Sequence, residues 1–332
     1  MARRILQTLL ACLVAGGAVG ASVAQGAAPT PGQAHIQPYL HPQRMIAVDG
    51  HRRLNLYCVG KGEPTVLFDS GMADATAVWR LVQPEVGKIT RACAYDRAGY
   101  GFSDRPSGPS DARAAVEDIH HLLTAAKISG PIVYVGHSIA GLYGVLLEGT
   151  YPGDVAAEVL VDPSFSDQIE ASIASLPPEK RKDVLPSQYA AVAQMKSCAA
   201  LPAPVPKKCL GGDSDTGPKD TALAKVEQKR VSKADYMLTN ASELESFLPK
   251  GSEQSADRQE VEKANASFGD KPLTILTRDK SPASWNAGHD KLAALSRRGS
   301  NTAVPNTSHY IQVDQPKSVI DAVIKAVRNV RH

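Results

Sequence analysis

The sequence predicts an α/β fold built on a mostly parallel, doubly wound sheet with an antiparallel hairpin at its N-terminal side. Short apolar runs alternate with helical patterns, which favours parallel strands covered by helices on both faces. Two strand-like segments near the start are separated by a glycine-containing turn, which is typical of a hairpin. A chain of 332 residues with 43% apolar and 21% charged residues also allows a substantial core.

The expected strands follow one another in a simple order. The hairpin pairs residues 44–50 with residues 52–60. The later strands are short runs in which most residues are apolar, as in strands that are buried on both faces. These runs occupy residues 64–71, 89–96, 130–136, 156–162 and 271–278. We therefore expect a mixed sheet that is parallel except at the hairpin.

Three helices of the core have clear sequence signals. Residues 111–128 form an amphipathic pattern with an acidic start. A second helix opens at Ser138, directly after a buried strand. Residues 315–330 form the last helix, which carries a proline in its first turn.

The segment between Asp162 and Lys271 differs from the rest of the chain. It is polar, interrupted by prolines and helical only in patches. We interpret residues 163–270 as an inserted helical cap, and residues 43–162 and 271–332 as the core domain that carries it.

The N-terminal segment is typical of a secretory signal peptide over residues 1–24. Two arginines precede an apolar stretch, and a small-x-small pattern ends at Ala24, where a signal peptidase would cut. A retained membrane anchor is the alternative, although three glycines weaken a spanning helix here. Lipidation at Cys12 is a further alternative. We expect a periplasmic or secreted protein in which residues 25–42 form a flexible lead-in.

The charge of the chain gives no support to strongly charged partners. Removing residues 1–24 deletes two arginines and no acidic residue, so the formal net charge falls from +3 to about +1. The sequence has no basic stripe for nucleic acid and no second hydrophobic span. We expect no nucleic-acid partner and no stable membrane insertion after signal removal. The oligomeric state is left open.

The segment VYVGHSIAGLYG, residues 133–144, places a serine where a strand turns into a helix. A hydroxyl on such a strained corner stands clear of the sheet, and the N–H groups of the helix start favour negative charge there. The usual G-x-S-x-G motif is altered, because Ala140 replaces its second glycine with the smallest possible side chain. Ser138 is the candidate nucleophile, and a plain serine N-cap is the alternative.

A serine nucleophile needs a base within hydrogen-bond reach. Of the nine histidines, His309 lies late in the chain on a polar loop before the last helix, the context expected for that base. His137 precedes the serine and points the wrong way to serve as its base. We assign His289 to a surface helix.

Two backbone N–H groups are candidates for an oxyanion hole. Ile139 N–H follows the candidate nucleophile directly. Met72 N–H lies on the loop after residues 64–71, where Gly71 lets the backbone approach closely. A simple strand-ending turn at this loop is the alternative.

These motifs, in this order and spacing, resemble the α/β-hydrolase superfamily. The resemblance rests on PTVLFDSGMADATAVW, ACAYDRAGYGFSD, IVYVGHSIAGLYG, EVLVDP and SHYIQVDQP, and it spans about residues 44–162 and 272–330. It is strongest to esterase- and lipase-like serine hydrolases with DSG in the oxyanion loop. It implies the α/β-hydrolase fold and a Ser-His-acid triad that needs no cofactor and no metal. It also implies that Asp96, Arg97 and Gly99 hold a loop rather than do chemistry.

The acid of the triad orients the imidazole and stabilises its protonated form. Within the superfamily the acid follows either of two strands, and both positions are occupied by aspartate here. We favour Asp162, which ends the strand after the nucleophile's helix, over Asp279, which follows the next strand. Asp290 is a third alternative.

Four cysteines remain after signal removal, and an even number in an oxidising compartment favours two disulfides. Their spacings contain no CxxC, so we expect no zinc site. Cys58 and Cys93 lie on strands that are neighbours in the fold implied by the resemblance. Cys198 and Cys209 flank a short loop of the cap. We therefore expect the pairs Cys58–Cys93 and Cys198–Cys209.

The leading hypothesis is an exported serine hydrolase that cleaves a carboxylic ester of a small molecule through an acyl-enzyme on Ser138. The same triad would also serve a lactonase, an amidase or peptidase, or a haloperoxidase-like enzyme. A catalytically silent binding protein on the same fold is the alternative from a different class.

Overall fold

The computed structural model describes residues 36–202, 204–209 and 221–332. The expected signal peptide, Cys12 and residues 25–35 of the lead-in lie outside the described residues. The end of the expected lead-in is structured, because Gln37–Leu40 form the 3-10 helix η2 and Tyr39 is buried. Among the residues that the structure describes, no helix has the length and apolar character needed to span a membrane.

The core of the molecule is an eight-stranded mixed sheet in the order β1-β2-β4-β3-β5-β6-β7-β8. Strand β2 runs antiparallel to β1 and to β4, and every other pairing is parallel. The strands are β1 (Arg44–Ala47), β2 (Arg53–Val59), β3 (Val66–Asp69), β4 (Ala92–Tyr95), β5 (Ile132–His137), β6 (Val155–Val161), β7 (Leu273–Arg278) and β8 (Gly299–Val304).

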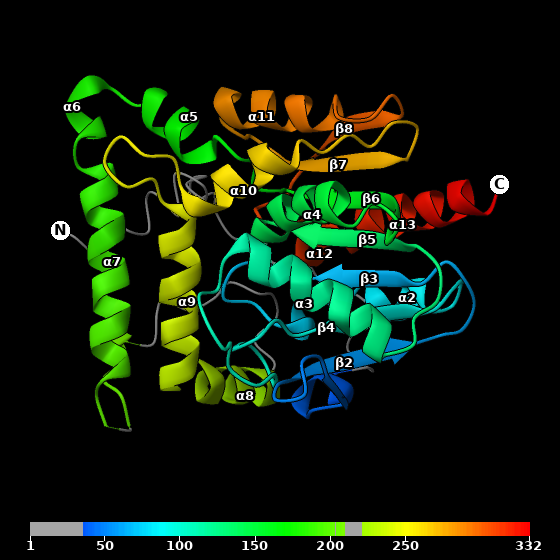
Figure 1. Ribbon diagram of the computed structural model, residues 1–332, viewed down its shortest axis with the longest axis horizontal. Coiled ribbons are helices and arrows are strands. Elements are labelled where there is room, and N and C mark those ends of the chain that lie inside the picture. Colours follow the sequence, from blue (N-terminus) through cyan, green and yellow to red (C-terminus); the bar gives the residue numbers. More distant parts are fainter. Residues whose placement is uncertain (1–35, 203, 210–220) are drawn as a thin grey trace, which may run out of the picture.

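Helices cover both faces of this sheet, as the alternation of elements predicts. In Figure 1, α3 and α4 cross in front of the strands and α13 lies behind them. Successive side chains of a strand enter opposite layers: Leu67 packs with α3 and α4, whereas Val66 and Phe68 pack with α13. The helices of the core are η3 (Thr76–Trp79), α2 (Gln83–Val86), α3 (Ala112–Ala125), α4 (Ile139–Thr150), α11 (Ala283–Ala293), α12 (Ile311–Asp314) and α13 (Pro316–Arg331).

A helical segment connects β6 to β7. Its helices are α5 (Gln168–Ala174), α6 (Pro178–Arg181), α7 (Val184–Ala199), η4 (Lys207–Cys209), α8 (Thr221–Val231), α9 (Ala234–Phe247) and α10 (Ala256–Ala264). Helices α7 and α9 pack against each other at the end of the sheet toward which the arrows of β5 and β7 point (Figure 1). In parallel α/β sheets, ligands bind outside the carboxyl ends of the strands. The helical segment therefore lies over the end of the sheet where a site is expected.

Two features of the fold differ from the sequence prediction or add to it. Strand β8 has no apolar pattern, because it is a largely exposed edge strand of polar residues. His289 is fully buried rather than on the surface, which corrects our assignment. Its ring bonds Thr277 Oγ1 at 2.6 Å and the backbone oxygen of Pro163 at 2.8 Å, so both polar nitrogens are satisfied away from water.

Both expected disulfides are present. Cys58 and Cys93 face each other on the antiparallel strands β2 and β4, and they are bonded. The bond ties the hairpin to the parallel part of the sheet. Cys198 and Cys209 are also bonded, within the helical segment between β6 and β7.

Candidate active site

Ser138 sits at a strained corner between β5 and α4. Its φ of +57° lies in a region that favours glycine, and such strain persists where the surroundings hold it. Gly136 makes this corner possible, because a Cβ there would lie 2.7 Å from the backbone oxygen of Ala140. A Cβ at Gly141 would lie 2.2 Å from Pro163. Because Pro163 lies so close to this helix, position 141 requires glycine. Position 140 accommodates the methyl group of Ala140.

Ser138, His309 and Asp162 form a continuous chain of hydrogen bonds. His309 Nε2 lies 2.9 Å from Ser138 Oγ, and His309 Nδ1 lies 2.5 Å from Asp162 Oδ2. The carboxylate fixes the tautomer, because Nδ1 must carry the hydrogen that it donates to Asp162. Nε2 is then free to accept the serine proton, which is the geometry of nucleophile, base and orienting acid.

Asp162 is a fully buried carboxylate with four hydrogen-bond donors around it. Arg278 contributes its Nη1 at 2.6 Å and its backbone N–H at 3.1 Å. Trp285 Nε1 donates at 3.2 Å, and His309 supplies the fourth bond. Burial alone raises the pKa of Asp162, but the hydrogen bond and charge of His309, together with the charge of Arg278, hold that pKa well below its usual range. Asp162 is therefore an anion at any pH at which the protein works.

The structure does not bring the other two candidate acids to the histidine. The carboxylate of Asp279 accepts a hydrogen bond from Asn306 N at 3.2 Å, and its backbone N–H donates to Thr307 Oγ1 at 3.1 Å. Asp290 lies on α11 and accepts from Asn301 Nδ2 at 2.8 Å. Of the three aspartates, Asp162 alone bonds the imidazole of His309.

The loop after β3 is a tight turn held from two sides. Asp74 N–H donates to Gly71 O at 3.2 Å and closes the turn, and Ala73 takes a φ of +66°. Arg97 Nη2 donates to Gly71 O at 2.9 Å, and Tyr236 Oη donates to Ala73 O at 3.1 Å. These bonds fix the backbone on either side of Met72.

The two expected oxyanion donors are backbone groups of this turn and of the start of α4. Within the described residues, neither Met72 N–H nor Ile139 N–H makes a hydrogen bond. Met72 also packs its side chain against apolar residues of α7 and α9. The backbone N–H of Met72 is therefore unbonded in the described part of the chain, while its side chain is anchored in the helical segment between β6 and β7.

Arg97 is the centre of a buried polar network below this turn. It pairs with Asp69 at 2.7 Å and with Glu243 of α9 at 2.9 Å. Asp96 accepts from Thr76 N at 2.7 Å and Asn55 Nδ2 at 2.8 Å. Both residues hold backbone segments in place and neither contacts Ser138 or His309 through a hydrogen bond in the described chain.

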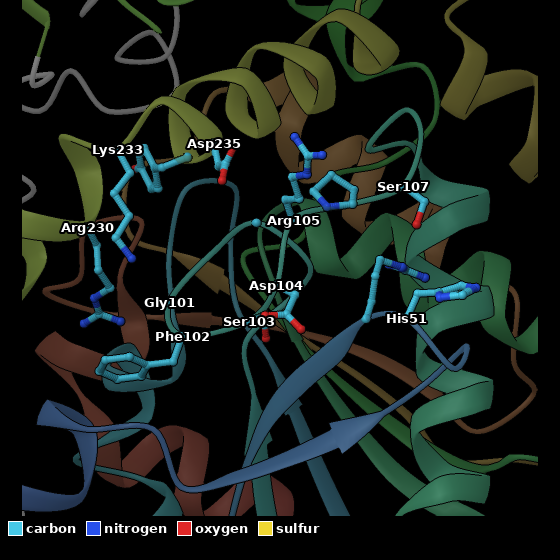
Figure 2. A pocket seen from close by; sticks show the side chains of 14 residues that line it. His51, Gly101, Phe102, Ser103, Asp104, Arg105, Ser107, Arg230, Lys233 and Asp235 are labelled. Carbon is cyan, nitrogen blue, oxygen red and sulfur yellow. The ribbon is translucent and has the colours of Figure 1, made fainter. Parts of the chain in front are cut away.

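A polar cavity of about 910 Å³ is lined by the turn between β1 and β2, the loop after β4 and the junction of α8 with α9 (Figure 2). Its lining includes His51, Arg105, Lys233 and Tyr236. Ser138, His309 and Asp162 do not line it. Figure 2 shows Arg230 over the ring of Phe102, where its charge is used within the protein in a pair with Glu227. This cavity is therefore not the place where the triad meets a substrate.

Arg278 and Trp285 are the residues of the site that sequence analysis missed. The Arg278 guanidinium lies 4.5 Å from the ring centre of Trp285 while it bonds Asp162. The position of Arg278 at the end of β7, immediately before the alternative acid Asp279, could have indicated a role in the site. Its contact with Asp162 depends on how the ends of β6 and β7 meet, which sequence spacing does not reveal.

Comparison with known proteins identifies the family. The sequence pattern of the alpha/beta hydrolase family matches residues 66–322 of the chain. The chain belongs to the alpha/beta hydrolase family. The chain is 38% identical over 87 residues to an uncharacterized vacuolar membrane protein of Saccharomyces cerevisiae, covering 25% of the chain and 14% of that relative. It is 31% identical over 121 residues to 2-hydroxy-6-oxo-2,4-heptadienoate hydrolase of Pseudomonas putida, covering 36% and 43%. The matches thus span less than half the length of these two relatives.

Solved structures of alpha/beta hydrolases superpose over most of the chain. An esterase from Thermogutta terrifontis matches with a TM-score of 0.63 at 17% identity, covering 88% of this chain and all of that one. A putative lipase from Acinetobacter baumannii gives 0.62 at 18% identity, covering 94% and 99%. A putative epoxide hydrolase from Pseudomonas aeruginosa gives 0.63 at 16% identity, covering 84% and 93%. At these identities the likeness establishes the fold.

Proposed function

We propose that the protein is an exported serine hydrolase that cleaves a carboxylic ester through an acyl-enzyme on Ser138. The observation that carries this proposal is the hydrogen-bonded chain from Ser138 Oγ through His309 to Asp162. A serine in this setting has a base to take its proton and an anion to stabilise the imidazolium that results.

The proposed reaction proceeds in two steps of acyl transfer. His309 Nε2 removes the proton of Ser138 as Oγ attacks the ester carbonyl. Met72 N–H and Ile139 N–H bind the oxyanion that develops, and the imidazolium returns its proton to the leaving alcohol. Water then attacks the acyl-serine with His309 again as base, which releases the acid and restores the serine.

The serine between β5 and α4 supports ester hydrolysis over two other reactions that enzymes of this fold catalyse. Epoxide hydrolases and haloalkane dehalogenases of this fold use an aspartate as nucleophile, and this chain has Ser138 there. Lactones and amides would react at the same triad, so both belong in a substrate panel.

Export is supported by the cysteines. Disulfides persist in oxidising compartments, and the described chain has two of them. The signal-like segment at residues 1–24 points the same way. Fractionation of cells that express the full chain, with N-terminal sequencing of the mature protein, tests export; a cytoplasmic protein that starts at Met1 would refute it.

The test of the activity uses purified mature protein and short-chain aryl esters, with lactones and anilides in parallel. We expect hydrolysis of the esters and stoichiometric labelling of Ser138 by a fluorophosphonate. Ser138→Ala should lose about 10⁴-fold or more in kcat while it keeps its folded circular dichroism spectrum. A wild-type protein that neither reacts with the probe nor hydrolyses any of these compounds is instead a silent binding protein.

A further inference from the structure

A second acid–histidine pair lies directly behind the triad. His137 Nδ1 and Asp74 Oδ2 are 3.8 Å apart, and both atoms are buried without a hydrogen-bond partner in the described structure. Gly71 separates them with no side chain, because a Cβ there would lie 2.9 Å from His137 Nδ1 and 3.0 Å from Asp74 Oδ2. Buried polar atoms are normally hydrogen-bonded, so the lack of a partner at both His137 Nδ1 and Asp74 Oδ2 needs a physical reason.

The other side of the His137 ring fixes where its proton resides. His137 Nε2 lies 3.0 Å from the backbone oxygen of His309. A carbonyl oxygen only accepts, so Nε2 must carry the hydrogen, and Nδ1 of the neutral ring is a bare acceptor. A carboxylate opposite this acceptor would be repelled. A protonated Asp74 would instead donate to it after a movement of about 1 Å.

The pair connects the three loops that build the site. Asp74 belongs to the turn that carries Met72, His137 precedes Ser138, and the carbonyl that His137 bonds belongs to His309. The hydroxyl of Tyr310, which follows His309, also donates to the Asp74 carboxyl group. Ala73 is strained at a φ of +66°, and a strained turn stays in place only when its neighbours hold it.

We propose that Asp74 and His137 form a positioning pair, with the shared proton on Asp74, that holds the oxyanion turn against the nucleophile and histidine loops. This inference rests on the proposed function. Loss of the proton places a negative charge next to the turn where the oxyanion develops, and it opposes the acceptor on His137. Catalysis then has an upper pH limit that comes from Asp74 rather than from the triad.

Burial supports the neutral form of both partners. It raises the pKa of Asp74 to about 7, and the carboxylates of Glu227 and Glu243 add to this rise while Arg97 opposes it. Burial also lowers the pKa of His137 to about 3, so its ring stays neutral. The groups that face Asp74 are His137 from β5, Tyr310 from the loop before α12, Arg97 from the loop after β4, Glu227 from α8, and Tyr236 and Glu243 from α9.

The test compares kcat/KM against pH in the wild type and in Asp74→Asn. The amide donates to His137 Nδ1 and accepts from Tyr310, but it cannot ionise. We expect wild-type kcat/KM to fall about tenfold as the pH rises past about 7, through kcat rather than KM. Asp74→Asn should keep near-maximal activity and lose this fall. Asp74→Leu, which can neither donate nor accept, should have a lowered kcat at every pH.

Two matched variants assign the effect to the pair. Asp321→Asn removes an exposed carboxylate on α13, and Glu227→Gln removes a partly buried neighbour whose pKa is also raised by desolvation. Asp321→Asn should keep the wild-type fall at the same pH. Glu227→Gln should keep a fall of the same size with its midpoint at lower pH, because the Glu227 charge that raises the pKa of Asp74 is gone. The inference is overturned if Asp74→Asn retains the fall, or if Glu227→Gln alone abolishes it.

A measurement on the wild type remains decisive if Asp74→Asn fails to fold. Nitrogen NMR of the His137 ring should show the Nε2–H tautomer and a shift of Nδ1 with its midpoint near pH 7. An Nδ1–H tautomer would overturn the pair. Fluorophosphonate labelling separates this outcome from the proposed function: a wild type that labels at Ser138 but shows no alkaline fall refutes the pair alone.

Discussion

Arg278 Nη1 lies 2.6 Å from Asp162 Oδ2 and 3.3 Å from His309 Nδ1, so a buried guanidinium sits beside the acid and the base of the site. The cation holds the carboxylate that orients the imidazole in its charged form.

Replacing Arg278 should therefore lower the stability of the protein. Arg278→Met leaves Asp162 without its ion pair, and we expect a loss of about 3 kcal/mol in the free energy of unfolding. Urea unfolding checks this outcome. Arg278→Lys, which keeps the charge, should lose less; an Arg278→Met variant as stable as the wild type contradicts the prediction.

The acid of the triad is tested by two aspartate variants. Asp162→Asn should lower kcat by about 10⁴-fold, because an amide opposite Nδ1 favours the wrong tautomer of His309. Asp279→Asn is the matched control, since Asp279 bonds Asn306 N and does not contact His309. It should keep kcat within about threefold of the wild type. Steady-state kinetics on one aryl ester distinguish the two, and a reversed order would restore Asp279 as the acid.

The disulfide between β2 and β4 should contribute to stability. It closes a loop with a sequence separation of 35 residues, which restricts the unfolded chain. Changing both Cys58 and Cys93 to serine should lower the free energy of unfolding by about 2–4 kcal/mol and leave kcat nearly unchanged. The same change at Cys198 and Cys209, with a separation of 11, should cost less. Chemical denaturation of the two double variants gives the comparison, and equal losses would argue against the loop-length account.

Asp257 should make the protein less stable as the pH rises. It is fully buried, accepts from Ala112 N at 2.8 Å, and burial raises its pKa to about 8. The unfolded chain releases this proton near pH 4, whereas the folded protein holds it to about pH 8, so stability falls between these values. Asp257→Asn should gain on the order of 2 kcal/mol at neutral pH and lose most of that pH dependence. Urea unfolding at several pH values checks this. Asp104→Asn, at a partly exposed site, should show neither effect.

Much of the site could be predicted from sequence because its parts follow strands. Ser138 follows β5 and Asp162 follows β6, and parallel strands bring their carboxyl ends to one edge of the sheet. Strand β8 could not be predicted, because an exposed edge strand needs no apolar pattern. The buried position of His289 was missed for a related reason: its polar ring is satisfied by partners 12 and 126 residues away along the chain.

The α/β class, the corner at Ser138 and the late position of His309 follow from the sequence alone, since apolar periodicity and glycine placement act locally. Three aspartates remained open for the acid. The choice among them depends on tertiary contacts, because the hydrogen bond from His309 Nδ1 to Asp162 Oδ2 joins residues 147 apart in the chain. The same holds for Arg278 beside Asp162 and for Asp74 opposite His137. Such contacts depend on how packed loops meet in space, and no local pattern encodes that.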